Sequence, residues 1–274
     1  MTYKDQNYRV HLMPKLSANI STLYPEMSFL QRFSAAAQDG FDAVEFQFAY
    51  EYTSTELVAA AKAASVKVVL LNCPAGDVEA GERGTAVFEE RIETCRQGID
   101  KGIAYARALD CKNIHLMAGI LADEDRLVAQ ATFKDNLRYA ADRFDRSDEV
   151  VLVEALNTID TPGYFVSNLA QAADIIDSTG YLNVRLQFDF YHCQMTQGRL
   201  AETFDRYLRL IEHIQVAGVP GRHELDCGEV NYDFLFNHID ASRYPGYVGC
   251  EYHPLVTTSK GLGPLKPWLS STAK

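Results

Sequence analysis

Four polar residues at the ends of short apolar runs carry the most chemical information in this sequence. Glu154 closes the run VVLVE, Asp189 closes VRLQFD, Glu251 closes YVGCE, and Gln215 interrupts the apolar run HIQVA. Three carboxylates buried together raise one another's pKa, and one divalent cation would remove that conflict. Carboxylate and amide oxygens are hard donors, so we predict Mg²⁺ or Mn²⁺. Zinc is disfavoured because no cysteine or histidine cluster joins the set.

Six further residues lie at the ends of predicted strands or in the segments after them and are candidates for binding substrate: Glu45, Asn72, Arg83, His192, Arg222 and His223. Arg83 lies between glycines in a loop that could close on an anion. His192 could donate a hydrogen bond to substrate or to a ligand carboxylate. Glu45 and Asn72 are expected to line the pocket or to contact the ligands. The alternatives are helix caps or surface ion pairs for the acids and solvated loop residues for the cations.

The elements that must position these residues alternate between short β-rich runs and helical stretches. We predict strands at 15–18, 43–46, 66–72, 113–117, 150–154, 184–189, 213–217 and 247–251. Helices are predicted at 28–39, 54–64, 89–109, 125–144, 169–179, 200–208 and 232–239. Repeated strand–helix units of ~30 residues predict a (β/α)8 TIM barrel, whose active site lies at the carboxyl ends of the strands. The alternative is a doubly wound sheet, but the sequence has no glycine-rich phosphate loop.

Composition favours a single domain over residues 1–274, with 1–12 as an N-terminal extension. The 274 residues are 47% hydrophobic and 23% charged, as in globular proteins. A net charge of −11 disfavours nucleic acid as a partner, and no apolar run is long enough for a membrane span. Six irregularly spaced cysteines and no signal peptide indicate the cytoplasm. Barrels of this type often associate, so a homo-oligomer is expected without an assigned interface.

Several segments together resemble the hydroxypyruvate isomerase family, which is part of the xylose isomerase-like TIM barrels and includes 2-oxo-tetronate isomerases. They are LSANISTLY (16–24), FDAVEFQF (41–48), NCPAGDVEAGERG (72–84), LVEALN (152–157), QFDFYHCQ (187–194), HIQVAGVPGRHE (213–224) and GYVGCEYHP (246–254). The resemblance implies a divalent metal on Glu154, Asp189, Gln215 and Glu251. It also implies that Glu154 and Glu251 form the acid–base pair. One departure is Ala155, where the family usually has proline.

The resemblance further implies an intramolecular oxidoreductase that interconverts hydroxypyruvate and tartronate semialdehyde through an enediolate, in carbohydrate metabolism. The partner is then a small 2-oxo or hydroxy acid, whose carboxylate Arg83, Arg222 or His223 would bind. A 2-oxo-tetronate isomerase and a sugar epimerase are alternatives with related chemistry. From other classes, a nuclease acting on abasic DNA requires a histidine-rich zinc site and a basic face. A non-catalytic sugar-binding barrel is the last alternative.

Overall fold

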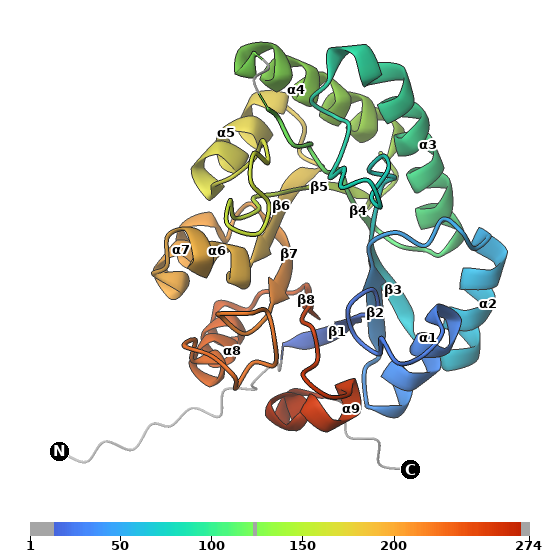
Figure 1. The fold of residues 1–274 in the computed structure, drawn as a ribbon, viewed down its shortest axis with the longest axis vertical. Coiled ribbons are helices and arrows are strands. Elements are labelled where there is room, and N and C mark those ends of the chain that lie inside the picture. Colours follow the sequence, from blue (N-terminus) through green and yellow to red (C-terminus); the bar gives the residue numbers. More distant parts are fainter. Residues whose placement is uncertain (1–13, 123–124, 270–274) are drawn as a thin grey trace.

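The described residues close into one parallel barrel. The computed structural model describes residues 14–122 and 125–269. Its strands follow one another around the barrel in chain order until β8 pairs with β1 (Figure 1). They are β1 (Lys15–Asn19), β2 (Ala43–Phe46), β3 (Lys67–Asn72), β4 (Asn113–His115), β5 (Val150–Glu154), β6 (Val184–Asp189), β7 (Ile211–Val216) and β8 (Tyr247–Cys250). The predicted (β/α)8 barrel is confirmed.

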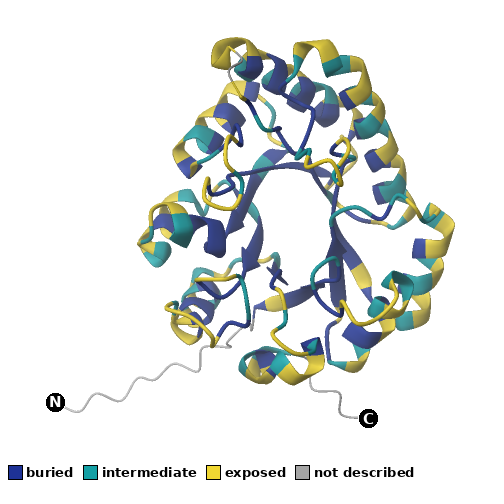
Figure 2. Ribbon diagram, viewed as in Figure 1, coloured by how far each residue is buried: buried dark blue, intermediate teal, exposed yellow. Residues whose placement is uncertain are grey.

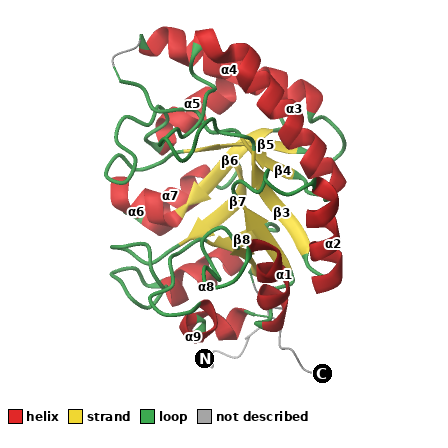
Figure 3. Ribbon diagram, turned by 45° about the vertical axis from the view of Figure 1, so that its right-hand side comes forward, coloured by secondary structure: helices red, strands yellow, loops and turns green. Residues whose placement is uncertain are grey.

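Helices enclose the strands on the outside (Figure 3). They are α1 (Phe29–Gln38), α2 (Ser54–Ala64), α3 (Ile92–Ala108), α4 (Arg126–Arg143), α5 (Leu169–Thr179), α6 (Phe190–Thr196), α7 (Leu200–Tyr207), α8 (Tyr232–Ser242) and α9 (Thr258–Gly261), with 3₁₀ turns η1 (Glu89–Arg91) and η2 (Gly263–Trp268). Figure 2 shows buried residues on the helix sides that face the barrel and exposed residues on the outer sides. In the described ranges, no helix combines the length and apolarity needed to cross a membrane.

Strands covered on both faces are mostly apolar, which is why the sequence located many elements closely. The predicted bounds of β2, α2, β5, α5 and β6 agree with the structure at both ends. Other bounds were wrong by a few residues: β4 ends at His115, β7 spans Ile211–Val216, and β8 ends at Cys250, one residue before Glu251. The predicted extension, residues 1–12, lies outside the described residues.

Helix α6, which spans Phe190–Thr196 and carries His192, was not predicted from the sequence. Asp189 caps this helix, and its side chain accepts a hydrogen bond from the backbone N–H of Tyr191 at 2.7 Å. Aspartate is among the preferred residues at this position because its carboxylate satisfies a free N–H of the first turn. The residue that ends β6 therefore also starts α6 and fixes where His192 lies.

Gly84 anchors the loop that carries Arg83. Its backbone pairs with Ala118, just after β4, in an isolated antiparallel bridge. The φ angle of Gly84 is +112°, and a Cβ atom here would lie 2.3 Å from the carbonyl oxygen of Met117. Only glycine permits both this backbone conformation and this close approach. The long loop between β3 and α3 is thereby held against the mouth of the barrel next to Arg83.

Replacing Arg107 with methionine should destabilise the barrel, because it leaves a buried carboxylate without its cation. Glu149, directly before β5, is 4% exposed, and both of its carboxylate oxygens accept from Arg107, at 2.9 and 2.8 Å. Breaking a fully buried pair costs about 3–5 kcal/mol. Because Arg107 is partly exposed, we expect a loss of about 2 kcal/mol in urea unfolding.

The control is Arg206→Met, which removes an exposed cation from α7. It should change the free energy of unfolding by less than about 0.5 kcal/mol. Equal losses in the two variants would contradict a stabilising role for the pair between Arg107 and Glu149.

Candidate active site

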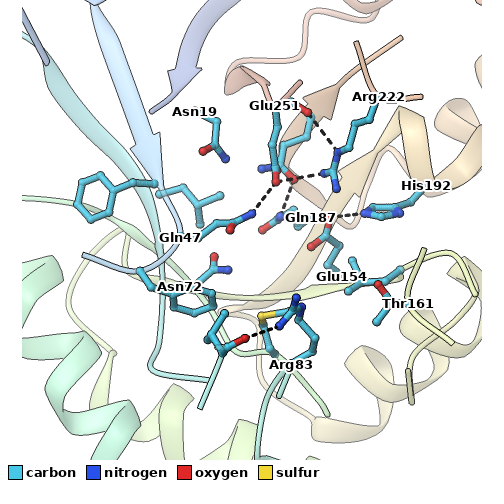
Figure 4. Close-up of a pocket in the computed structure, with 17 residues that line it drawn as sticks. Asn19, Gln47, Asn72, Arg83, Glu154, Thr161, Gln187, His192, Arg222 and Glu251 are labelled. Carbon is cyan, nitrogen blue, oxygen red and sulfur yellow. Dashed lines mark hydrogen bonds and ion pairs between the residues drawn. The ribbon is translucent and has the colours of Figure 1, made fainter. Parts of the chain in front are cut away.

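A pocket of about 160 Å³ lies at the carboxyl ends of the strands (Figure 4). Seven of the ten predicted site residues line it: Asn72, Arg83, Glu154, His192, Gln215, Arg222 and Glu251. Asp189 lies beside the pocket, in contact with two of its lining residues, Arg222 and His192. Glu45 and His223 do not line the cavity. The strand ends thus gather most of the predicted site in one small space.

Three carboxylates reach this region from different strand ends. Glu154 is the last residue of β5, Asp189 is the last of β6, and Glu251 directly follows β8; each is at most 6% exposed. Arg222 bridges two of them, because its Nη2 lies 3.2 Å from Asp189 Oδ2 and 3.1 Å from Glu251 Oε1. Gln47 donates to the same Glu251 oxygen at 2.7 Å. One arginine therefore faces an excess of buried negative charge.

The pKa values of these acids reflect that excess. Burial raises the pKa of Glu154 well above its usual value, and the neighbouring Asp189 and Glu251 raise it further. Burial also raises the pKa of Glu251 to about 7, although Arg222 opposes the shift. The pKa of Asp189 is raised by burial as well, again against Arg222. Without another cation, the three acids therefore bind protons more readily than exposed carboxylates do.

His192 presents a hydrogen-bond donor to the carboxylates. Its Nδ1 lies 3.2 Å from the backbone N–H of Asn157 and 2.8 Å from the side-chain nitrogen of that residue. A backbone N–H can only donate, so Nδ1 accepts and the single proton of the neutral ring sits on Nε2. Burial and Arg222 keep the ring neutral by lowering the pKa of His192 well below its usual value. Nε2 lies 3.7 Å from Asp189 Oδ2 and 4.0 Å from Glu154 Oε1.

The carboxamide of Gln215 is held at both ends. Its nitrogen donates to Glu45 Oε1 at 2.8 Å, and its oxygen accepts from the side-chain nitrogen of Gln187 at 2.7 Å. A carbonyl oxygen has two lone pairs, so the oxygen of Gln215 can accept a second partner. Gln187 lines the pocket, and its own side-chain oxygen is buried with no hydrogen-bond partner in the described part of the chain.

The donor set suits a hard divalent cation. Glu154, Asp189 and His192 can each place one ligand atom within 4.8 Å of the others, but the proton on Nε2 removes His192 from the ligands. The carboxylate oxygens of Glu154, Asp189 and Glu251 remain, with the amide oxygen of Gln215. Such oxygens fit Mg²⁺ or Mn²⁺. The raised pKa values fit as well, because a cation would displace protons that these buried acids otherwise retain.

Some of the predicted substrate-binding residues line the pocket and others do not. Arg83 lines the pocket and donates to the backbone carbonyls of Val78 and Glu82, at 3.2 and 2.9 Å. Over the described ranges it forms no ion pair, so its charge is free to bind an anion. His223 instead points away from the pocket lining, and its Nδ1 lies 2.8 Å from the backbone oxygen of His253. Glu45 is fully buried inside the barrel and contacts Gln215 instead of the cavity.

Sequence analysis missed four polar residues that line the pocket: Asn19, Gln47, Thr161 and Gln187. Two of them follow from the two-residue period of a strand, which places residues i and i+2 on the same face. Gln187 lies two residues before Asp189, and Gln47 lies two residues after Glu45. Thr161 lies in the loop between β5 and α5, where no such period applies.

Comparisons with known proteins agree with this architecture. A family model described as a xylose isomerase-like TIM barrel matches residues 33–268. A 2-oxo-tetronate isomerase from Cupriavidus necator is 45% identical over 94% of this chain and 99% of its own length. A hydroxypyruvate isomerase from Escherichia coli is 42% identical over 93% and 100%. A crystal structure from Brucella melitensis, described as an AP endonuclease of family 2, is 40% identical with a TM-score of 0.92 and covers 94% of this chain and 100% of that one.

Replacing Glu154 with glutamine should stabilise protein from which metal has been removed with EDTA. A folded-state pKa above the unfolded value means that stability falls as the pH rises from about 4.5 through the folded-state pKa. Glutamine at this position removes that loss. At pH 8 we therefore expect the variant to have a higher Tm than wild type. Each unit of pKa shift corresponds to about 1.4 kcal/mol of unfolding free energy, and each kcal/mol changes Tm by about 2–4 °C. The difference should shrink toward pH 4.5, and a lower Tm at pH 8 would contradict the prediction.

Proposed function

The chain belongs to the xylose isomerase-like TIM barrel family, and from this premise we propose that it is a metal-dependent isomerase that interconverts hydroxypyruvate and tartronate semialdehyde. Its curated relatives support isomerase activity, because they are named for hydroxypyruvate or 2-oxo-tetronate isomerisation. The observation that carries the proposal is the group of three buried carboxylates with raised pKa values around one pocket of about 160 Å³. Such a small cavity suits a substrate of three or four carbons.

Glu154, Asp189, Gln215 and Glu251 would hold the metal, Mg²⁺ or Mn²⁺. When bound, this cation would polarise the substrate carbonyl and stabilise the negative charge that develops on its oxygen. Arg222 contacts Asp189 and Glu251 in this structure, so its single positive charge offsets part of the negative charge of two proposed ligands. His192 offers its Nε2 proton to an oxygen on the substrate, because Asn157 fixes the tautomer.

The reaction requires one proton to leave C3 of hydroxypyruvate and another to reach C2, while the hydroxyl proton passes from O3 to O2. No net oxidation occurs, and the intermediate is an enediolate. Glu154 and Glu251 project into the pocket from β5 and from the end of β8 (Figure 4). One carboxylate accepts the first proton and the other acid delivers the second, which is the role of a general acid–base pair. Arg83 would hold the substrate carboxylate at the opposite side of the pocket from Glu251.

A four-carbon substrate, 2-oxo-tetronate, is the second candidate. The names of the relatives from Cupriavidus necator and Pectobacterium atrosepticum favour it. It presents the same carbonyl and hydroxyl to the site and adds one carbinol group. The ratio of kcat/KM for the two substrates distinguishes the candidates, because both would use the same acid–base pair.

Nuclease activity, which the name of the Brucella melitensis structure suggests, fits the site less well. A net charge of −11 repels a phosphodiester backbone. Among the described residues, the one candidate metal cluster that combines acidic and histidine side chains is Glu154, Asp189 and His192. The proposed oxygen donors lack the histidine-rich zinc set that such a nuclease requires.

Replacing Arg83 with methionine should raise the KM for hydroxypyruvate more than it lowers kcat. The guanidinium would contact the carboxylate equally in the ground state and the transition state, so its loss removes uniform binding. A charge-assisted hydrogen bond is worth about 1.5–3 kcal/mol, so KM should rise about 10- to 100-fold in steady-state assays. Arg206→Met removes an exposed cation on α7 that does not line the pocket, and it should leave KM unchanged. An unchanged KM in the Arg83 variant would contradict its role.

Turnover in D₂O tests the acid–base pair. Hydroxypyruvate converted with Mg²⁺ or Mn²⁺ should yield product with solvent deuterium at C2, because a proton held by a carboxylate exchanges with water. Glu251→Gln should lower kcat by about 10²-fold or more. Glu93→Gln, which neutralises an exposed acid on α3, is the control and should retain kcat. Product without deuterium would indicate a hydride shift, and full activity in the Glu251 variant would contradict the assignment.

A further inference from the structure

Glu45 is a buried carboxylate that the proposed reaction does not use. It is 0% exposed and lies inside the barrel on β2. Four donors converge on it: Gln215 at 2.8 Å and Asn19 at 3.3 Å on Oε1, with Ser17 at 2.7 Å and His213 at 2.8 Å on Oε2. Each of its two oxygens is therefore held by two donors, and the carboxylate acts only as an acceptor in these contacts.

The partner on Oε1, Gln215, has two chemically different ends. Only its oxygen can bind a cation, whereas its nitrogen can only donate. Because the carboxylate of Glu45 accepts from every donor around it, the nitrogen of Gln215 faces Glu45 and its oxygen faces away. The oxygen then accepts from Gln187, a pocket residue, and keeps a free lone pair. Glu45 thus determines the direction in which the asymmetric side chain of Gln215 points.

The barrel also keeps Glu45 from moving. Ser17 and His213 bind the oxygen that Gln215 does not use, so the carboxylate cannot rotate away. On β8, Gly249 leaves the space that the carboxylate fills, because a Cβ atom there would lie 2.3 Å from both oxygens of Glu45. Residues of β1, β2, β7 and β8 therefore fix one hydrogen bond to Gln215.

We propose that Glu45 is a positioning residue that orients the carboxamide oxygen of Gln215 toward the metal. The inference rests on the proposed function, because it assumes that Gln215 is a ligand. Outer contacts that orient a ligand typically change metal affinity by about 10- to 100-fold when they are removed. Metal affinity, measured without turnover, is therefore the appropriate readout.

The experiment titrates metal-free protein with Mn²⁺ and measures free Mn²⁺ by electron paramagnetic resonance. Glu45→Met removes the acceptor and should weaken Mn²⁺ binding by about 10- to 100-fold. Glu45→Gln should remain within about threefold of wild type, because its oxygen can still face Gln215 while its nitrogen faces Ser17 and His213, both of which can accept. Glu93→Gln, which neutralises an exposed acid on α3 outside this network, is the control and should match wild type.

The outcomes separate this role from a purely structural one. Equal Mn²⁺ affinities for Glu45→Met and wild type would overturn it. It would also be overturned if Glu45→Gln bound Mn²⁺ as weakly as Glu45→Met while its Tm stayed unchanged. Absence of Mn²⁺ binding by wild type, or wild-type affinity in Gln215→Ala, would overturn the metal site itself and with it this role.

A second pair of variants applies if Glu45→Met does not fold. Gln215→Glu alone places two carboxylates in contact and should weaken Mn²⁺ binding. Combining it with Glu45→Gln restores a donor–acceptor contact in the reverse direction, with the new amide nitrogen facing position 215 and its oxygen facing Ser17 and His213. Recovery of Mn²⁺ affinity in the double variant would support the proposal, and no recovery would overturn it.

Discussion

Buried negative charge is the constraint on which this site depends. Glu154, Asp189 and Glu251 are each at most 6% exposed, so water cannot stabilise their ionised forms. The surrounding contacts reduce the cost only in part: Arg222 bridges two of the acids, and Gln47 donates to one. The same concentration of charge that disfavours ionisation is what supports the proposed cation and the proposed proton transfer.

The parallel barrel brings these groups together because all of its strands end at the same face. Asp189 serves both β6 and α6, since one of its oxygens caps the helix and the other faces Arg222. The helix then places His192 one turn further on, with its Nε2 proton near the carboxylates. Local backbone requirements and the site's chemistry are therefore met by the same side chain.

Much of the fold could be predicted because buried parallel strands are mostly apolar and their helices end at clear signals, such as Gly180 after α5. The acids that end apolar runs were visible for the same reason. The direction in which a loop side chain points could not be predicted from the sequence. Arg222 and His223 are neighbours of similar character, yet one turns to carboxylates far away in the chain and the other to the backbone of His253. Such contacts depend on tertiary packing, which no local pattern encodes.

Glu45 and Glu154 show that burial by itself does not decide the direction of a pKa shift in this barrel. Glu45 is fully buried, yet four donors within the barrel keep its pKa low. Glu154 faces two other acids, and its pKa is raised well above the usual value. The chain can therefore satisfy a buried carboxylate from its own side chains. It does so beside Gln215 but not at the pocket, and this difference supports the proposal that the pocket carboxylates take a cation from outside the chain.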